Sequence, residues 1–384
     1  MDKENCELTI RLIIAQNLLI VVHLLAYFNA AVFLGFVGVS PSATHTLVLK
    51  RDGSVWATGL NDNGQLGDDS TESKVDFVKV MDADVMAVAT GGSHSLLLKQ
   101  DGTVWGAGRN NVGQLGSALR KEDKHNFVQL ATRVTSVAAG RLHSVLLKAD
   151  GKVFAAGYNL YGQLGDNSND DRIKYTSSIE SGAIAVSAGD YYTMVLKQDG
   201  TVWATGRNDR GQLGDGSEHD RKTYTKVINS DVRAVAAGAS HTIVLKQDGS
   251  VWGTGDNDSG QLGDGSTKSE KSFTKIIDDG VWAVAAGLHH TVVLKRDNSV
   301  WTAGKNGAGQ LGDGSAIDGR NTFEKVMSSG AKSVFAGDYI TMVLTYGGTV
   351  WATGLNLNGQ LGDGSNTTKS IFVPVIALKK GAWD

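Results

Sequence analysis

The tetrapeptide Gly-Gln-Leu-Gly recurs seven times along the chain, beginning at residues 64, 113, 162, 211, 260, 309 and 359. Successive copies are 49 residues apart five times and 50 residues apart once. The surrounding sequence recurs as well, as in GASHTIVLKQDGSVWGTGDNDSGQLGDGS at residues 238–266. A fixed period of this length indicates a repeat architecture, in which residues at equivalent positions are mostly structural. Function must therefore be sought where the copies differ.

Each repeat contains four segments that predict short β-strands. One representative set is Tyr224–Val227, Val235–Gly238, Thr242–Lys246 and Val251–Gly255. The last two segments are usually joined by Asp-Gly, which predicts a type I′ hairpin. The 49 glycines and 2 prolines also suit a chain rich in tight turns. Because no helical periodicity is present, the sequence predicts an all-β fold, a seven-bladed β-propeller of four-stranded blades.

The two ends of the chain predict how the ring closes. Ile371–Val375 copies the Phe-x-Lys-Val segment, but no second segment follows it. Gly38–His45 begins at a second segment, with no first segment before it. We therefore expect the C-terminal strand to complete the first blade and close the ring, which would remove exposed sheet edges.

The predicted domain organisation is an N-terminal hydrophobic extension, residues 1–36, followed by the propeller, residues 37–384. No Asp, Glu, Lys or Arg occurs from Leu12 to Leu49, and this stretch is long enough to span a bilayer. Its mixed-charge flank, with Asp2 and Glu4, does not match the basic region of a secretory signal. A membrane anchor through residues 12–36, a signal and a buried extension all stay open. The compartment, cytoplasmic or membrane-anchored, stays open with them.

Composition argues against several classes of function. The net charge is −3 with no basic run, so no nucleic-acid binding is expected. The single cysteine, Cys6, lies outside the repeats, which excludes a disulfide framework or a cysteine nucleophile in the propeller. Apart from the residues that recur in every repeat, the sequence shows no catalytic residue pattern and no phosphate-binding loop. We therefore expect a monomeric protein that is not an enzyme and needs neither cofactor nor metal.

Two recurrent residue types receive structural interpretations. The histidines lie in different blades, too far apart to share one metal ion, and we expect each to anchor a turn; they are His45, His94, His143, His241 and His290. The tryptophans occupy one strand position, where packing between blades accounts for them; they are Trp56, Trp105, Trp203, Trp252, Trp301 and Trp351.

The pattern Ala-Ala-Gly-x-x-His-Thr, followed by Asp-Gly-x-Val-Trp-x-x-Gly-x-Asn-x-x-Gly-Gln-Leu-Gly, resembles the regulator of chromosome condensation repeat. The resemblance implies a seven-bladed propeller over about nine tenths of the chain. Members of that family include an exchange factor for the small GTPase Ran, a plant ultraviolet-B photoreceptor and a bacterial β-lactamase inhibitor. The photoreceptor carries tryptophan in the turn before the histidine; this chain does not, which argues against light sensing.

The repeats diverge in two sets of loops that strand order places on one face. These are the turns before the histidine position and the loops after Val-Trp-x-x-Gly. Tyrosine and arginine, which are enriched at interface hot spots, are frequent among the divergent residues. The candidate partner-binding residues are Arg141, Leu142, Tyr158, Tyr161, Asp190, Tyr191, Arg207, Arg210, Leu288, His289, Asp338 and Tyr339.

These observations favour a protein–protein interaction module that binds an unidentified protein partner through this loop face. One alternative, implied by the resemblance, is a guanine-nucleotide exchange factor for a small GTPase. The uniform repeat length leaves no room for the inserted wedge of the Ran exchange factor. A further alternative is a secreted inhibitor-like binding protein, which would require the N-terminal segment to be a signal.

Overall fold

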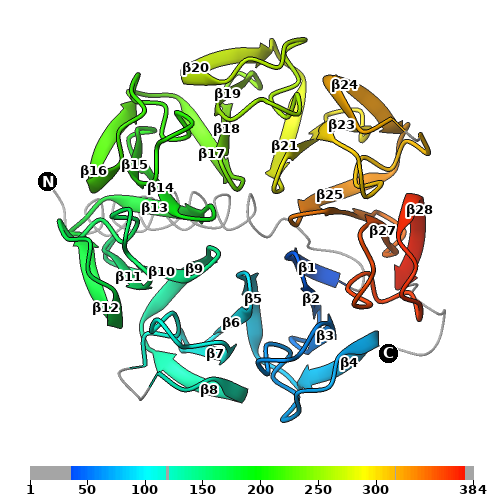
Figure 1. The fold of residues 1–384 in the computed structure, drawn as a ribbon. Coiled ribbons are helices and arrows are strands. Elements are labelled where there is room, and N and C mark those ends of the chain that lie inside the picture. Colours follow the sequence, from blue (N-terminus) through cyan, green and yellow to red (C-terminus); the bar gives the residue numbers. More distant parts are fainter. Residues whose placement is uncertain (1–35, 118–120, 316, 377–384) are drawn as a thin grey trace, which may run out of the picture.

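A computed structural model describes residues 36–117, 121–315 and 317–376, which form seven antiparallel sheets of four strands each. The sheets are arranged as blades around a central axis (Figure 1). The predicted all-β, seven-bladed propeller of four-stranded blades is therefore confirmed. The described residues contain no helix, so none there is long and apolar enough to span a bilayer. The predicted extension, residues 1–36, lies outside the described residues except for Phe36.

Within each blade the strands follow chain order from the central channel outward. The innermost strands contact one another around the channel; they are β1 (Phe36–Pro41), β5 (Val85–Thr90), β9 (Val134–Ala139), β13 (Ala183–Ala188), β17 (Val232–Ala237), β21 (Val281–Ala286) and β25 (Ala331–Ala336). The second strands are almost wholly buried; they are β2 (His45–Lys50), β6 (His94–Lys99), β10 (His143–Lys148), β14 (Tyr192–Lys197), β18 (His241–Lys246), β22 (His290–Lys295) and β26 (Ile340–Thr345).

The third strands carry the Val-Trp pair or its variants; they are β3 (Val55–Gly59), β7 (Val104–Gly108), β11 (Val153–Gly157), β15 (Val202–Gly206), β19 (Val251–Gly255), β23 (Val300–Lys305) and β27 (Val350–Gly354). The outer strands expose about every third residue; they are β4 (Lys74–Met81), β8 (Lys124–Ala131), β12 (Arg172–Ile179), β16 (Arg221–Ile228), β20 (Glu270–Ile277), β24 (Gly319–Met327) and β28 (Lys369–Ile376).

The ring closes without a strand exchanged between its ends. The first blade consists of β1 to β4, all from residues 36–81. The C-terminal strand β28 pairs with β27 in the last blade, where Trp351 lies opposite Pro374. The expectation that Ile371–Val375 completes the first blade is therefore wrong. The error lies in the phase of the repeat, because the Phe-x-Lys-Val segment is the fourth strand of one blade and not the first strand of the next.

Each Gly-Gln-Leu-Gly loop packs on the outer strand of the next blade. In the first repeat, Gly67 has a φ of 71° and lies against the ring of Phe127 on β8, which leaves no room for a Cβ. In the last repeat, Gly362 lies against the ring of Phe77 on β4 in the same way. We call the contact between two neighbouring blades a seam. The seam between the last and first blades is thus closed by the same packing as the other six.

Tryptophans of the third strands pack across the seams, as the sequence predicts. Trp252 of the fifth blade packs on a buried cluster that includes Val202 and Leu213 of the fourth blade. The Lys246 ammonium lies 4.3 Å from the centroid of the Trp252 ring, a cation–π distance. The Trp252 ring therefore packs on an apolar cluster across the seam and carries the Lys246 ammonium of its own blade over its face.

The hairpins between second and third strands differ from the predicted type I′ turns. Gly53 has a φ of 79°, whereas Asp52 is absent from the described residues with positive φ. The Gly53 N–H donates to the Lys50 carbonyl at 3.1 Å, and the Lys50 N–H to the Ser54 carbonyl at 2.9 Å. This is a three-residue loop, a type I turn followed by a left-handed glycine. The aspartate is explained by its carboxylate, which accepts from the Ser54 N–H at 2.8 Å.

Candidate functional site

The two sets of divergent loops lie on one face, as strand order predicts. The N–H of the residue after a third strand donates to the carbonyl just before the histidine position. Examples are Tyr158 to Leu142 at 3.0 Å and Arg207 to Tyr191 at 2.9 Å. We call the surface made by the turns between first and second strands and the loops after third strands the loop face. The hairpins between second and third strands form the opposite hairpin face.

Three of the candidate tyrosines meet on the loop face between the third and fourth blades. The ring centroids lie 6.3 Å apart for Tyr158 and Tyr161, 5.8 Å for Tyr158 and Tyr191, and 5.4 Å for Tyr161 and Tyr191. These spacings and the inclined ring planes are typical of favourable aromatic pairs. The Arg207 guanidinium carbon lies 5.5 Å from the centroid of the Tyr161 ring. We call these four side chains the tyrosine cluster.

The tyrosine cluster is partly exposed and has an apolar neighbour in the same loop. All four of its members are half-buried, and Leu160, between two of them in sequence, is 56% exposed. Burial raises the pKa of Tyr158 and of Tyr191, so both phenols stay neutral at physiological pH. The result is a rigid surface with aromatic rings, hydroxyl groups and one guanidinium.

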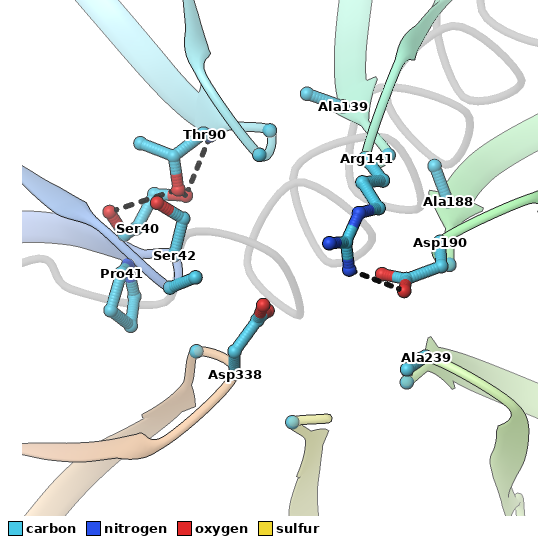
Figure 2. A pocket seen from close by; sticks show the side chains of 18 of the residues that line it. Ser40, Pro41, Ser42, Thr90, Ala139, Arg141, Ala188, Asp190, Ala239 and Asp338 are labelled. Carbon is cyan, nitrogen blue, oxygen red and sulfur yellow. Dashed lines mark hydrogen bonds and ion pairs between the residues drawn. The ribbon is translucent and has the colours of Figure 1, made fainter. Parts of the chain in front are cut away.

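Beside the tyrosine cluster, the loop-face end of the central channel forms a cavity of about 350 Å³. Its wall is mostly glycine, alanine and backbone, with charged side chains that include Arg141, Asp190 and Asp338. Arg141 Nη1 lies 3.2 Å from Asp190 Oδ2, and the Arg141 N–H also donates to the Asp190 carbonyl at 3.2 Å. Figure 2 shows this pair on one side of the cavity and Asp338 on another.

Both carboxylates have a pKa above that of an exposed aspartate, chiefly because of burial. Burial and the charge of Asp190 raise the pKa of Asp338 to about 7, although Arg141 and His289 act in the opposite direction. Burial also raises the pKa of Asp190, and the neighbouring Arg141 partly offsets that rise. The charge of Arg141 acts on both half-buried carboxylates, but its ion pair is with Asp190.

The remaining candidate residues surround the cavity or lie farther out. Leu142 lines the cavity, and the Leu288 N–H donates to the Asp338 carbonyl at 3.1 Å. His289 Nδ1 lies 3.4 Å from the buried carboxylate of Asp256. Arg210 is occupied in an exposed ion pair with Asp258 at 3.1 Å. Tyr339, next to Asp338, has a pKa raised by burial and by that carboxylate.

Two functional candidates were missed by the sequence reasoning. Arg109 lines the cavity and holds Asn111 Oδ1 at 3.1 Å from its Nε. It directly follows its third strand, at the position that Arg207 occupies two repeats later. A comparison of this position in all seven repeats would have found it. Leu357 is 66% exposed on the loop face and occupies the same loop position as Leu160.

The recurrent histidines join neighbouring blades through a hydroxyl relay. His143 Nε2 lies 3.0 Å from the Thr193 hydroxyl of the next blade, and that hydroxyl donates to the Gln163 carbonyl at 2.8 Å. Because the hydroxyl proton is used on the carbonyl, Nε2 must carry the other proton and donate. Equivalent contacts link His45 to Ser95, His94 to Ser144, His241 to Thr291 and His290 to Thr341.

Burial keeps these histidines neutral, which suits side chains that support the fold. All five are fully buried, and burial lowers the pKa to about 3 for His45, His143 and His290 and to about 4 for His94 and His241. No group of three or more His, Cys, Asp or Glu side chains suited to a metal ion occurs in the described part of the chain. The structural interpretation fits this geometry, but the expected anchoring of a turn by the ring does not: the ring bonds across to the next blade, and the turn is held by the backbone, as where the Gly140 N–H donates to the His143 carbonyl at 2.9 Å.

Comparisons with known proteins agree with this geometry. Residues 24–316 match the family model described as RCC1-like domain, and residues 331–360 match the regulator of chromosome condensation (RCC1) repeat. A search of curated protein sequences found no match.

Three solved structures are similar in fold. Human WBSCR16 has a TM-score of 0.76 at 23% identity, covering 85% of this chain and 94% of that one. Yeast RCC1 (Prp20), in a structure bound to Kap60, has a TM-score of 0.76 at 18% identity, covering 88% and 85%. Prp20p from Saccharomyces cerevisiae, in a study of its binding to Gsp1p and histones, has a TM-score of 0.76 at 17% identity, covering 93% and 89%.

Proposed function

This chain belongs to the family of RCC1-like domains, and we propose that it is a non-enzymatic module that binds a protein partner through its loop face. Propellers of this kind serve as rigid scaffolds whose loops carry the specificity. The partner surface comprises the tyrosine cluster and the neighbouring cavity at the channel end.

The tyrosine cluster is the observation that carries this proposal. Aromatic side chains and arginine in a compact, half-buried group are typical of interface hot spots, and the exposed Leu160 adds apolar area beside them. The fold does not need these side chains. The position of Tyr191 is filled by Ser93 in the second repeat and by Ser240 in the fifth, with the same strand pairing.

The test is to replace Tyr158 and Tyr191 separately by alanine and to compare partner binding and melting temperature with those of the unchanged protein. Proteins captured by the unchanged chain are identified by mass spectrometry, and each is purified for titration. We expect each substitution to weaken binding of a true partner by roughly 1–3 kcal/mol and to leave the fold intact.

A matched control for these variants lies on the hairpin face. Gln198 is exposed there, and Gln198→Ala should leave binding unchanged. It is a cleaner control than charge reversal at Lys148 or Lys197, because each of those ammonium groups lies 4.4 Å from an aromatic ring centroid. Binding that responds to Gln198→Ala and not to the tyrosine variants would place the partner on the wrong face for this proposal.

The alternative function is guanine-nucleotide exchange on a small GTPase. It is favoured by the similarity to Prp20p, whose binding to the protein Gsp1p is named with its structure. We rank it second because all repeats are 49 or 50 residues long, which leaves no inserted wedge. Release of a labelled guanine nucleotide from a Ran-type GTPase should stay at its basal rate; acceleration of about a hundredfold or more, worth roughly 3 kcal/mol of barrier, would reverse the ranking.

A further inference from the structure

Asp338 presents a carboxylate that the protein itself does not use. It lies in the turn between β25 and β26, and its side chain points into the cavity at the channel end (Figure 2). Within the described residues no hydrogen bond or ion pair reaches that carboxylate. Arg141, whose charge acts on Asp338, forms its ion pair with Asp190 at 3.2 Å.

The fold does not require an acid at this position. The equivalent residue is Gly92 in the second repeat and Ala239 in the fifth, and both turns keep the same hydrogen bond from the glycine before that residue to the histidine carbonyl. A half-buried carboxylate without a partner costs stability. A residue that is dispensable for folding and unfavourable in isolation is best explained by something that binds to it.

We propose that the cavity at the loop-face end of the channel receives a cationic side chain, a lysine or arginine of the protein partner, with Asp338 as its acceptor. This inference rests on the proposed function and names the chemistry of the partner at one point. An ionised carboxylate only accepts hydrogen bonds, and an ammonium or guanidinium only donates them. Such a charge-assisted bond is stronger inside a cavity than on an open surface.

The pairing also predicts a dependence on pH. The groups that face the Asp338 carboxylate are Asp190, Arg141, His289 and Tyr339. Burial, followed by the charges of Asp190, Arg141 and His289, places the Asp338 pKa at about 7. Only the ionised form attracts a cation, so binding should strengthen as the pH rises through about 7, and a bound cation should lower that pKa.

The experiment uses the full chain and two small probes, methylguanidinium for an arginine head group and methylammonium for a lysine head group. Carbon-13 NMR of labelled aspartate carboxyl groups follows Asp338 during each titration. We expect saturable shifts of the Asp338 signal, a lowered Asp338 pKa and about tenfold weaker binding in Asp338→Asn. Asp258→Asn, at an exposed carboxylate on the same face, is the matched control and should bind the probes as the unchanged chain does.

Two outcomes would overturn the inference. One is a shift that does not saturate, or that is the same in the unchanged chain and in Asp338→Asn. The other is saturable binding of acetate in place of the cations, which would make Arg141 the recognising group and the cavity an anion site. Neither outcome changes the result expected for the Tyr158 and Tyr191 variants. Failure of the cation-binding inference can therefore be distinguished from failure of the proposed function. If methylguanidinium binds and methylammonium does not, the partner supplies an arginine.

Discussion

The last blade and the six before it share one architecture but differ in how they hold their neighbours. In five of the first six blades a histidine N–H donates to a hydroxyl of the next blade. In the fourth blade the Tyr192 hydroxyl takes this place and donates to the His241 carbonyl at 2.5 Å. The last blade has Ile340 at this position. Across its seam Thr46 keeps only the bond to the Gln360 carbonyl, at 2.7 Å.

The closing seam therefore depends on apolar packing and on side-chain hydrogen bonds to backbone carbonyls. Ile340, Met342 and Leu361 of the last blade form one buried cluster with Val39 and Val48 of the first. The Gln360 amide adds a bond to the Ala43 carbonyl at 3.1 Å. The hydroxyl–carbonyl bond and the loop-on-strand packing are thus the constant parts of a seam, and the histidine is an addition to them.

Mild acid should produce the largest effect, because the histidines of five seams bind protons far more readily in the unfolded chain than in the folded one. The unfolded histidines have a pKa near 6.5, whereas burial lowers the folded values to about 3 or 4. Stability is thus complete above about pH 6.5 and falls as the pH drops toward the folded pKa, because the unfolded chain binds the extra protons. The loss should reach about 2 kcal/mol per histidine at pH 5.

Urea unfolding at a series of pH values measures this loss. The control is the series above pH 7, where stability should be nearly constant as far as the histidines are concerned. Equal stability at neutral pH and at about pH 5 would mean that the five imidazoles do not stay neutral in the folded ring.

Deletion of residues 371–384 should have the next largest effect, at a seam other than the closing one. Phe372 lies against Gly312 of the preceding loop, and losing such a ring costs about 3–5 kcal/mol. The melting temperature should fall by about 10 °C. Hydrogen exchange should speed up in β27 and around Gly312, while β4 keeps its protection. Equal loss of protection in β4 would restore the strand-exchange closure that the topology contradicts.

A matched pair of substitutions compares the two kinds of seam directly. Thr193→Val removes a hydroxyl that serves both His143 and the Gln163 carbonyl, so two buried groups lose a partner and the cost should be roughly 3 kcal/mol. Thr46→Val removes one bond and should cost about 1–2 kcal/mol. Chemical denaturation measures both. Equal costs would show that the histidine N–H contributes nothing to its seam.

The smallest predicted effect concerns a second difference in the last blade. Lys295 holds its ammonium 3.8 Å from the centroid of Trp301, but Thr345 stands at the equivalent position before Trp351. Thr345→Lys should add a cation–π contact and raise stability by about 0.5 kcal/mol. Lys295→Thr is the converse variant and should lose a similar amount. Thermal unfolding of both variants tests whether this contact is additive around the ring.

Much of the fold could be predicted because the repeat displays the same pattern seven times. The strand segments, the blade number and the structural histidines all follow from positions that agree between copies. The phase of the repeat could not be predicted this way, because a periodic pattern has no intrinsic starting point. Ile371–Val375 looks like a beginning only if Phe-x-Lys-Val is taken to open a blade, and its pairing partner is set by tertiary contacts such as Trp351 with Pro374.

The face that carries the candidate site could be predicted from the sequence, but which of its residues lie together could not. Strand parity places Tyr158 and Tyr191 on one side of the molecule, and divergence between repeats selects them. Their convergence with Tyr161 depends on which blades are neighbours and on the 5.4–6.3 Å spacing of the rings. The Asp338 carboxylate has no ion-pair partner among the described residues because Arg141 pairs with Asp190. No spacing in the sequence reveals this pairing, because it joins turns of two neighbouring blades.

The loop-on-strand packing also has a consequence for the order in which the chain can fold during synthesis. The outer strand of the first blade buries Phe77 against Gly362, and the backbone of Val75 accepts from the Gly364 N–H at 3.2 Å. Both glycines emerge from the ribosome nearly three hundred residues after β4. Such distant contacts are slow to form and leave apolar surface uncovered in the meantime. The blade that is made first therefore keeps its outer strand uncovered until the last repeat has been made.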